Sequence, residues 1–430
     1  MNLASRFWIS HLKEASWVAI SQIAAAAGAL LAIKACTNVL DPAEFGRFSA
    51  VLAIAGLGQA CFFGPVSQSA TRFLSVARAQ DVLAAYWFSL IKLYLLGASA
   101  AIACGLVLTL AGLGYRLPMP APLVVLYTLA VGLQTIQLAA INAARFRKWV
   151  AGLQITDALL RPALVLAVAF LAARSSSNVV SSYILTSAVI IAASGVLAVS
   201  GSGRLHLPPS RSLREVASSS IVRQMSSFAS LFVTFGVLGA VGSHGERLLL
   251  IDFVSWQDVG VYALLMQLAM APNLMMTNLI NQYYLPMVFH SDPLASGKLG
   301  RSYQYYLAIS IVGILAIAVC VATLGRWIVP LFSSAAFLGH EHLLWYLALS
   351  AGLFNLGQQL VLPGMRENRL SVYLPSKLLH SVALLSLALL LVPKWGITGM
   401  ALASMIAAAA YTFSIICANV YLARTAPIAT

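Results

Sequence analysis

Apolar runs of about 20 residues recur along the whole chain, and each is long enough to cross a hydrocarbon core of ~30 Å. Of the 430 residues, 60% are hydrophobic and only 9% are charged, whereas about a quarter of a soluble chain is charged. The pattern predicts an all-α polytopic membrane protein. We expect twelve transmembrane spans, near residues 16–37, 48–66, 86–111, 120–141, 152–172, 179–200, 224–243, 259–285, 303–324, 343–362, 373–392 and 397–420.

The basic residues predict an orientation in the membrane. The formal charge is +14, from 26 Lys and Arg against 12 Asp and Glu. The positive charges are scattered over short loops and form no basic stripe, so nucleic acid is not an expected partner. With the N-terminus in the cytoplasm, sixteen positive residues fall on the cytoplasmic side and six on the other. The positive-inside rule therefore predicts that both termini are cytoplasmic.

The longest loop, GSGRLHLPPSRSLREVASSSIVR at 201–223, divides the chain nearly in half. It predicts a cytoplasmic linker between an N-terminal six-helix lobe at 1–200 and a C-terminal six-helix lobe at 224–430. A faint internal repeat agrees with this division. DPAEFGRFSA at 41–50 and SWQDVGVYAL at 255–264 each place an acid two residues before a Gly and an aromatic two residues after it. Because both lobes would begin on the same side, the repeats are expected to be parallel.

Polar side chains inside spans identify candidate cavity walls, since lipid cannot satisfy them. In QITDALLRPALVLAVAF at 154–170, Arg161 lies about 14 Å from the cytoplasmic end of its span, at 1.5 Å per residue. Asp157 lies one turn away on the same helix face, and Pro162 permits a local kink. The pattern has two interpretations: a cationic substrate site positioned by its own carboxylate, or a structural ion pair between helices.

A polar stripe lies along the span near 259–285. Its members recur every three or four residues and so share one helix face; they are Asn273, Thr277, Asn281 and Tyr284. Such side chains suit sugar hydroxyls or a hydrated passage, and they equally suit interhelical hydrogen bonds. Gln134 and Gln358 are lesser candidates of the same kind in two other spans.

Three further cations lie within spans but nearer their ends: Lys34, Lys92 and Lys377. Each is a candidate for binding an anionic substrate, and each can also reach the interface by snorkelling. His380 lies one turn from Lys377, so this pair is a candidate for anion binding or for proton relay.

Several kinds of chemistry have no support in the sequence. There is no G-x-x-x-x-G-K-[ST] phosphate loop, and GHEH at 339–342 lacks the His spacing of a zinc helix, so no metal is expected. Every outer loop is short, so an enzyme is not expected. Apart from Asp157, all acidic residues fall in loops or near span ends, which argues against a cation exporter because such exporters need deep carboxylates.

Three segments carry a family resemblance. They are NVLDPAEFGRFSAVLAIAG at the first outer turn, ERLLLIDFVSWQDVGVYALLMQLA at 246–269 and WGITGMALASMIA at 395–407. Together with twelve spans in two halves, they resemble the polysaccharide-transporter branch, which includes Wzx-type flippases, of the multidrug/oligosaccharidyl-lipid/polysaccharide exporter superfamily. In the last segment, Met400 and Ala401 replace the single alanine that ends the family's G-[IV]-x-G-A turn.

The resemblance implies a two-lobed fold around a central cavity, like that of the multidrug exporters (MATE). It implies a bacterial inner-membrane flippase that moves an undecaprenyl-pyrophosphate-linked oligosaccharide by alternating access, for O-antigen or exopolysaccharide synthesis. The family's cavity cations would correspond here to Arg161, Lys34, Lys92 and Lys377.

The expected partners are therefore the lipid-linked oligosaccharide and membrane lipid, with other polysaccharide-assembly membrane proteins as candidates. No cofactor is expected, although Asp157 or His380 is a candidate for proton or sodium coupling. Two alternatives stay open: a cation-coupled drug or metabolite antiporter of the same fold, and a membrane glycan polymerase or ligase.

Overall fold

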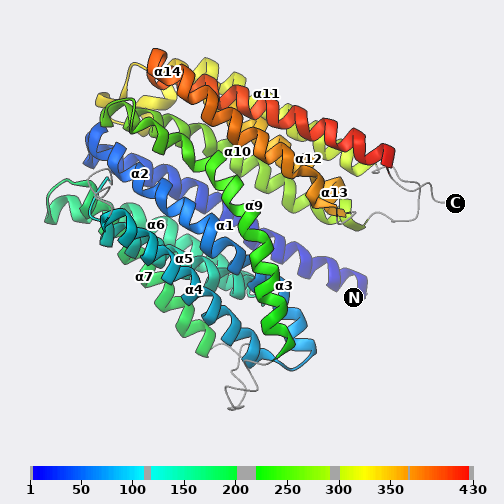
Figure 1. Cartoon of the computed structure of the whole chain (residues 1–430). Helices are drawn as coiled ribbons and strands as arrows, with labels where there is room; N and C mark the ends of the chain where they lie inside the picture. The colour runs from blue at the N-terminus through cyan, green and yellow to red at the C-terminus, as the bar shows by residue number, and fades with distance from the viewer. Residues whose placement is uncertain (1–2, 111–117, 201–218, 291–300, 367–368, 426–430) are drawn as a thin grey trace. The chain divides into compact units, whose positions relative to one another are not determined.

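The computed structural model describes residues 3–110, 118–200, 219–290, 301–366 and 369–425 (Figure 1). Within these ranges every regular element is helical. The first half contains α1 (Leu3–Val39), α2 (Pro42–Gly58), the π-helix η1 (Gln59–Phe63), α3 (Gly64–Ala79), α4 (Leu83–Leu110), α5 (Ala121–Ala143), α6 (Arg147–Leu171) and α7 (Ser176–Ser200). The second half contains α9 (Ser220–Leu250), α10 (Trp256–His290), α11 (Arg301–Phe332), η3 (Ala335–Phe337), η4 (Glu341–Leu343), α12 (Leu344–Leu360), α13 (Leu362–Arg366), η5 (Leu370–Tyr373) and α14 (Leu374–Thr425).

The predicted all-α membrane fold is confirmed: nine helices or helix runs in the described ranges are long and apolar enough to cross a membrane. Two of the twelve predicted spans, 224–243 and 343–362, are not among these nine runs. Two of the nine runs are longer than a single predicted span. The helix predicted at 48–66 belongs to a longer run, Pro42–Ala79, which passes through η1. The spans predicted at 373–392 and 397–420 lie on either side of Gly396, whose positive φ of 54° breaks α14 into two segments.

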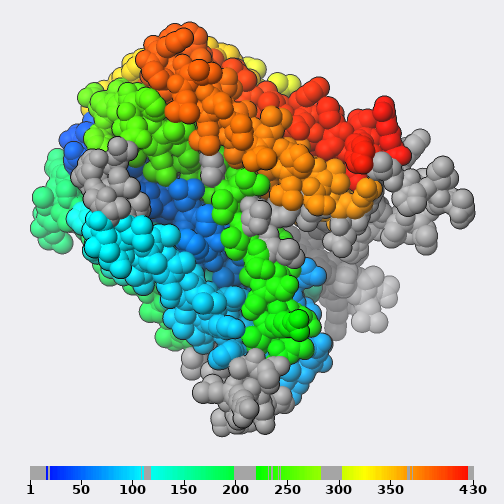
Figure 2. Space-filling model, viewed as in Figure 1, coloured from blue at the N-terminus to red at the C-terminus, as the bar shows by residue number. Residues whose placement is uncertain are grey.

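Contacts between residues divide the chain into two compact units. Unit 1 contains residues 1–40 and 47–244, and unit 2 contains residues 41–46 and 245–430. In unit 1, α1 packs along α6 and α5 packs against α3 and α7; in unit 2, α12 packs between α10, α11 and α14. Side chains fill the space between neighbouring ribbons of each unit (Figure 2). The linker predicted at 201–223 lies mostly outside the described residues, so its role stays a prediction.

The two copies of the internal repeat form the starts of two helices. Asp41 precedes Pro42 at the start of α2, and its carboxylate accepts a hydrogen bond of 2.8 Å from the backbone N–H of Glu44. Ser255 precedes α10 and accepts one of 3.2 Å from the N–H of Asp258. Both are N-caps, which satisfy backbone donors that have no partner inside the helix. The repeat is therefore a pair of capping motifs.

The glycines of the repeat allow these two helix starts to touch within unit 2. A Cβ on Gly46 would clash with the carbonyl of Trp256, and a Cβ on Gly260 would clash with the carbonyl of Pro42. Only glycine permits such a close backbone approach. The two copies thus share the same spacing between cap and glycine because each glycine packs against the start of the other helix.

Candidate functional site

Arg161 and Asp157 form an ion pair on consecutive turns of α6. The Nε of Arg161 lies 3.0 Å from both carboxylate oxygens of Asp157. The two side chains are 24% and 23% exposed, so each is partly accessible. Gln134 on α5 donates a hydrogen bond of 3.2 Å from its Nε2 to the same carboxylate. The structure therefore brings together three of the predicted site residues.

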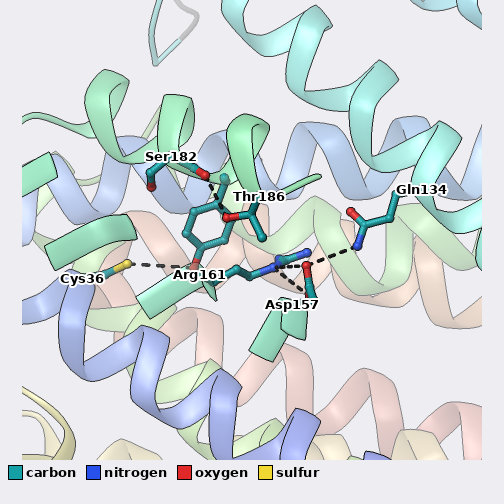
Figure 3. Close-up of polar contacts among 7 residues, drawn as sticks. Cys36, Gln134, Asp157, Arg161, Ser182 and Thr186 are labelled. Carbon is teal, nitrogen blue, oxygen red and sulfur yellow. Dashed lines mark hydrogen bonds and ion pairs between the residues drawn. The ribbon is translucent and has the colours of Figure 1, made fainter. Parts of the chain in front are cut away.

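Aromatic side chains cover the other side of the guanidinium. The Cζ of Arg161 lies 5.1 Å from the ring centroid of Tyr183 on α7, a cation–π contact worth about 0.5–2 kcal/mol. Figure 3 shows Arg161 beside Asp157, with Gln134 on one side of this pair and Cys36 on the other. The Cys36 sulfur lies 3.9 Å from the Tyr183 hydroxyl, and Tyr127 of α5 packs against Tyr183 with ring centroids 6.3 Å apart.

The close approach of α1 and α6 depends on two residues. A Cβ on Gly28 would clash with Ala158, whose carbonyl oxygen would lie only 2.6 Å away. Pro162 has no N–H to donate to that same carbonyl, because residue 158 is its partner four residues earlier in the helix. The glycine of α1 thus packs on the backbone group that the proline leaves open, and this contact holds α6 next to α1 one turn from Arg161.

The other predicted cations lie on α1, α4 and α14. Lys34 is half-buried on α1, and Lys92 is exposed on α4 beside the exposed Ile91. In unit 2, Lys377 is half-buried on α14. His380 is 5% exposed, and its ring lies 4.9 Å from that of Phe354.

The polar stripe of α10 lies in unit 2 and is largely buried. Asn273 donates hydrogen bonds of 3.0 and 3.1 Å to the carbonyls of Ala269 and Ala348. The Tyr306 hydroxyl donates to the Asn281 side chain at 2.7 Å. The bonds to Ala348 and from Tyr306 join α10 to α12 and to α11. For these two residues of the stripe, the interhelical hydrogen bonds that the sequence allowed are therefore present.

Two polar atoms of the stripe have no hydrogen-bond partner among the described residues. They are the buried atoms Asn273 Oδ1 and Thr277 Oγ1. Gln358 on α12 is half-buried. The side chain of Tyr284 lies outside the described part of the structure. Among the described side chains of the stripe, these two unpartnered atoms stay candidates for sugar contacts, and Gln358 is a further candidate on α12.

Glu246 is a buried carboxylate that the sequence pattern did not predict. It follows the span predicted at 224–243 and so was expected near a span end, but α9 continues to Leu250 and Glu246 is only 4% exposed. It accepts hydrogen bonds from the hydroxyls of Tyr262 and, at 2.8 Å, Ser404; Ser350 in turn lies 2.8 Å from Ser404. The apolar run LLLI that follows Arg247 was the available signal that the helix goes on.

The histidines of the GHEH segment do not form a metal site with a third ligand. The rings of His340 and His342 lie 6.2 Å apart. Among the described residues, no group of three or more His, Cys, Asp and Glu side chains is arranged to hold a metal ion.

Three-dimensional comparison shows the MATE-like fold that the sequence predicts. The chain is similar to a multidrug resistance MATE family transporter of the MOP superfamily in an inward-facing conformation, with a TM-score of 0.68, 12% identity and coverage of 96% of this chain and 100% of that one. It is also similar to the lipid II flippase MurJ in an inward closed conformation, with a TM-score of 0.69, 12% identity and coverage of 94% and 87%. A mutant of the Vibrio cholerae MATE transporter VcmN gives a TM-score of 0.52 at 14% identity, with 97% of each chain covered.

At these identities the similarities establish the fold and not the substrate. The family follows from the sequence itself, because residues 11–291, more than half of the chain, match the model of the polysaccharide biosynthesis protein family. The chain belongs to this family. No curated protein matches it in a sequence search.

Proposed function

We propose that this protein is a flippase that moves an undecaprenyl-pyrophosphate-linked oligosaccharide repeat unit across the bacterial inner membrane by alternating access, for the synthesis of O-antigen or exopolysaccharide. The observation that carries the proposal is a partly accessible arginine, Arg161, within a transmembrane helix of a polysaccharide biosynthesis family member. A cation at this depth is costly unless it is paired or has a function.

Arg161 is oriented so that it can bind an anionic head group. Asp157 contacts the Nε edge of the guanidinium and Tyr183 lies over its face. A guanidinium has five N–H donors, so donors beyond the Nε–H remain for a charge-assisted contact with phosphate. In the proposed mechanism Asp157 and Gln134 fix the side chain, and Arg161 holds the pyrophosphate while the oligosaccharide crosses.

The remaining candidates supply secondary contacts in this proposal. Lys34, Lys92 and Lys377 add positive potential along the route of the anion. Thr277, Gln358 and the stripe of α10 offer hydrogen bonds to sugar hydroxyls. Coupling to protons or sodium through Asp157 or His380 belongs to the same proposal.

Arg161→Ala tests the proposal in a strain that lacks its own flippase for the repeat unit. We expect the variant to lower surface glycan by about tenfold or more, because a charge-assisted hydrogen bond to phosphate is worth roughly 1.5–3 kcal/mol. Arg161→Lys should restore part of the output, since it keeps the charge and loses the bidentate fork.

Arg326→Ala is the matched control, because Arg326 is an exposed arginine stacked on Trp327 in α11. It should leave glycan output unchanged. Normal glycan with Arg161→Ala, at equal protein in the membrane, would show that Arg161 does not bind the substrate.

A second candidate function is a cation-coupled drug or metabolite antiporter of the same fold. Glu246 favours it, because a buried carboxylate is the group that such a transporter uses to hold its coupling cation. In this case cells that express the chain would tolerate cationic dyes, and Glu246→Gln or Asp157→Asn would abolish the tolerance. If expression of the chain confers dye tolerance and its loss leaves surface glycan unchanged, the protein is an antiporter and the flippase proposal is wrong.

A further inference from the structure

Unit 1 contains an apolar pocket away from the Arg161 cluster. Its volume is about 310 Å³, and its walls come from α2, η1, α4, α5 and α9. Thr128 contributes the single hydroxyl of the lining, and this hydroxyl already donates a hydrogen bond of 2.8 Å to the carbonyl of Val124. The pocket therefore offers no unused hydroxyl to a ligand and suits only an apolar one.

Local backbone features create the pocket. Gln59–Phe63 form a π-helix, an element that often marks functional sites, and two of its residues, Cys61 and Phe62, line the pocket. The Gln59 amide fixes this turn to α5 by donating a hydrogen bond of 3.4 Å to the Thr128 carbonyl. Gly105 of α4 also lines the pocket, and a Cβ there would lie 2.6 Å from Val125. This glycine therefore lets α4 approach α5 closely beside the pocket, and the π-helix supplies the neighbouring part of the lining.

The pocket is partly open, and its opening lies on a surface that faces lipid. Cys104 of the pocket is exposed. Its neighbours on α4, Ile102 and Leu106, are 50% and 56% exposed, as expected for side chains in contact with hydrocarbon. At membrane depth the available apolar ligand is a lipid chain, because water finds no polar partners in such a space.

The size of the pocket indicates how much of a chain it holds. A volume of 310 Å³ accommodates roughly ten groups of the size of water, at about 30 Å³ each. A methylene group is of similar size, so the pocket takes about ten carbon atoms, or two isoprene units. Lipid tails are as apolar as this lining, so hydrophobic transfer does not choose between them. The occupant is chosen by its fit to the pocket and by where its head group is held.

We infer that this pocket binds isoprene units near the head-group end of the polyprenyl chain of the lipid-linked substrate; the inference rests on the proposed flippase function. Helix α5 contributes to both places, with Val125 in the pocket and Gln134 on Asp157. These residues are nine positions apart, or about 14 Å along the helix at 1.5 Å per residue. The first isoprene unit is bonded directly to the phosphate, so a chain whose pyrophosphate lies at Arg161 reaches the pocket with the units that follow.

Photolabelling tests the inference on the full chain in phosphatidylcholine nanodiscs. One probe is a polyprenyl phosphate with a diazirine in the isoprene units near its phosphate, and the other is a phosphatidylcholine with a diazirine in an acyl chain. We expect the polyprenyl probe to label peptides that contain Cys61 and Cys104, as mapped by mass spectrometry. Cys104→Trp should reduce this labelling severalfold, because the indole ring takes the space that the chain would occupy.

Cys320→Trp is the matched control, because Cys320 is an exposed cysteine of α11 in unit 2, and it should leave the labelling unchanged. Cys61→Phe fills the pocket from η1 instead of α4 and serves if Cys104→Trp fails to fold. Labelling of the pocket by the phosphatidylcholine probe alone, or polyprenyl labelling that ignores both pocket variants, would overturn the inference.

The two proposals can fail separately. If Arg161→Ala retains normal glycan while the polyprenyl probe still labels the pocket, the head-group role is wrong and the tail site stands. If Arg161→Ala loses glycan while the probe labels other helices, the flippase stands and the tail site is wrong.

Discussion

Each unit contains a carboxylate within a helix, and the two have different partners. In unit 1 Asp157 is partly accessible and forms an ion pair with Arg161 on its own helix. In unit 2 Glu246 is almost fully buried beside Arg247, and its hydrogen bonds come from two hydroxyls, those of Tyr262 and Ser404. The first arrangement keeps a cation available to an anionic ligand, whereas the second leaves a carboxylate whose hydrogen bonds come from neutral dipoles.

The internal repeat shows how the difference arises. Phe48 and Tyr262 occupy the same position of the repeat, two residues after its glycine. Phe48 packs on Tyr183, with ring centroids 5.1 Å apart, and so supports the ring that covers Arg161. Tyr262 instead donates a hydrogen bond to Glu246. The two equivalent residues thus differ by one hydroxyl group. Without it, Phe48 packs against the ring that covers Arg161; with it, Tyr262 forms a hydrogen bond to Glu246.

The largest expected effect comes from breaking the pair in unit 1 one residue at a time. Arg161→Leu leaves Asp157 without its cation, and removal of one partner of a buried pair costs about 3–5 kcal/mol, less where the pair is partly accessible as here. The double variant Asp157→Leu/Arg161→Leu removes both charges and should be more stable than either single variant. Thermal unfolding of the purified proteins in detergent measures the three values, and a double variant less stable than both single variants would contradict mutual neutralisation.

The next effect concerns Glu246. Glu246→Leu leaves the hydroxyls of Tyr262 and Ser404 buried without their acceptor, at about 1–3 kcal/mol for each buried donor. Glu246→Gln keeps one acceptor oxygen and should cost clearly less. The surface control is Glu341→Gln, which changes a carboxylate that accepts an exposed hydrogen bond from the N–H of Gly339. Equal losses of thermal stability for Leu and Gln at position 246 would mean that the hydroxyl network does not depend on the carboxylate.

A smaller effect tests the aromatic cover of Arg161. Tyr183→Leu removes the cation–π contact, worth about 0.5–2 kcal/mol, and should lower glycan output by up to about tenfold through a displaced guanidinium. Tyr183→Phe keeps the ring and loses only the contact of its hydroxyl with Cys36, so it should retain nearly full output. Complementation assays at equal amounts of protein in the membrane compare the two variants. An equal defect in both would mean that the Tyr183 hydroxyl, and not the ring, is required.

The smallest effect is expected for a neutral contact of unit 2. Asn273→Ala removes the hydrogen bond to the Ala348 carbonyl, and bonds of this kind between membrane helices average about 0.6 kcal/mol. We expect a small loss of thermal stability and unchanged glycan. A severe loss of glycan at normal stability would instead assign Asn273 to the transport path, through its unpartnered Oδ1.

The sequence predicted the helices well because their signal is local. Hydrocarbon thickness fixes the length of an apolar run, so each span is legible without knowledge of its neighbours. Gly396 divides α14 through a positive φ between the two spans predicted there. The boundary that moved is that of the second span, which is longer than predicted because α2 and α3 continue across a π turn.

The candidate site was predictable only in part. Asp157 and Arg161 are four residues apart on one helix, so their pairing follows from helical geometry alone. Gln134 was a candidate by its type, but its bond to Asp157 joins residues 23 positions apart. Tyr183 and Glu246 escaped notice, because an aromatic residue in a span and an acid near a span end are ordinary features until packing shows what they touch.

The sequence by itself determined that this chain is a helical membrane protein of a polysaccharide biosynthesis family, and that one of its spans holds an ion pair. These properties depend on hydropathy, on local spacing and on the family pattern, all of which are written along a single chain. Only the tertiary structure decided what each buried charge meets: an aromatic ring and an amide for Arg161 and Asp157, and two hydroxyls for Glu246. It also created the apolar pocket from five segments. Such partners come from helices that are far apart in the sequence. Because a polar group without a partner in lipid is costly, the packing of these helices determines which buried groups are stable.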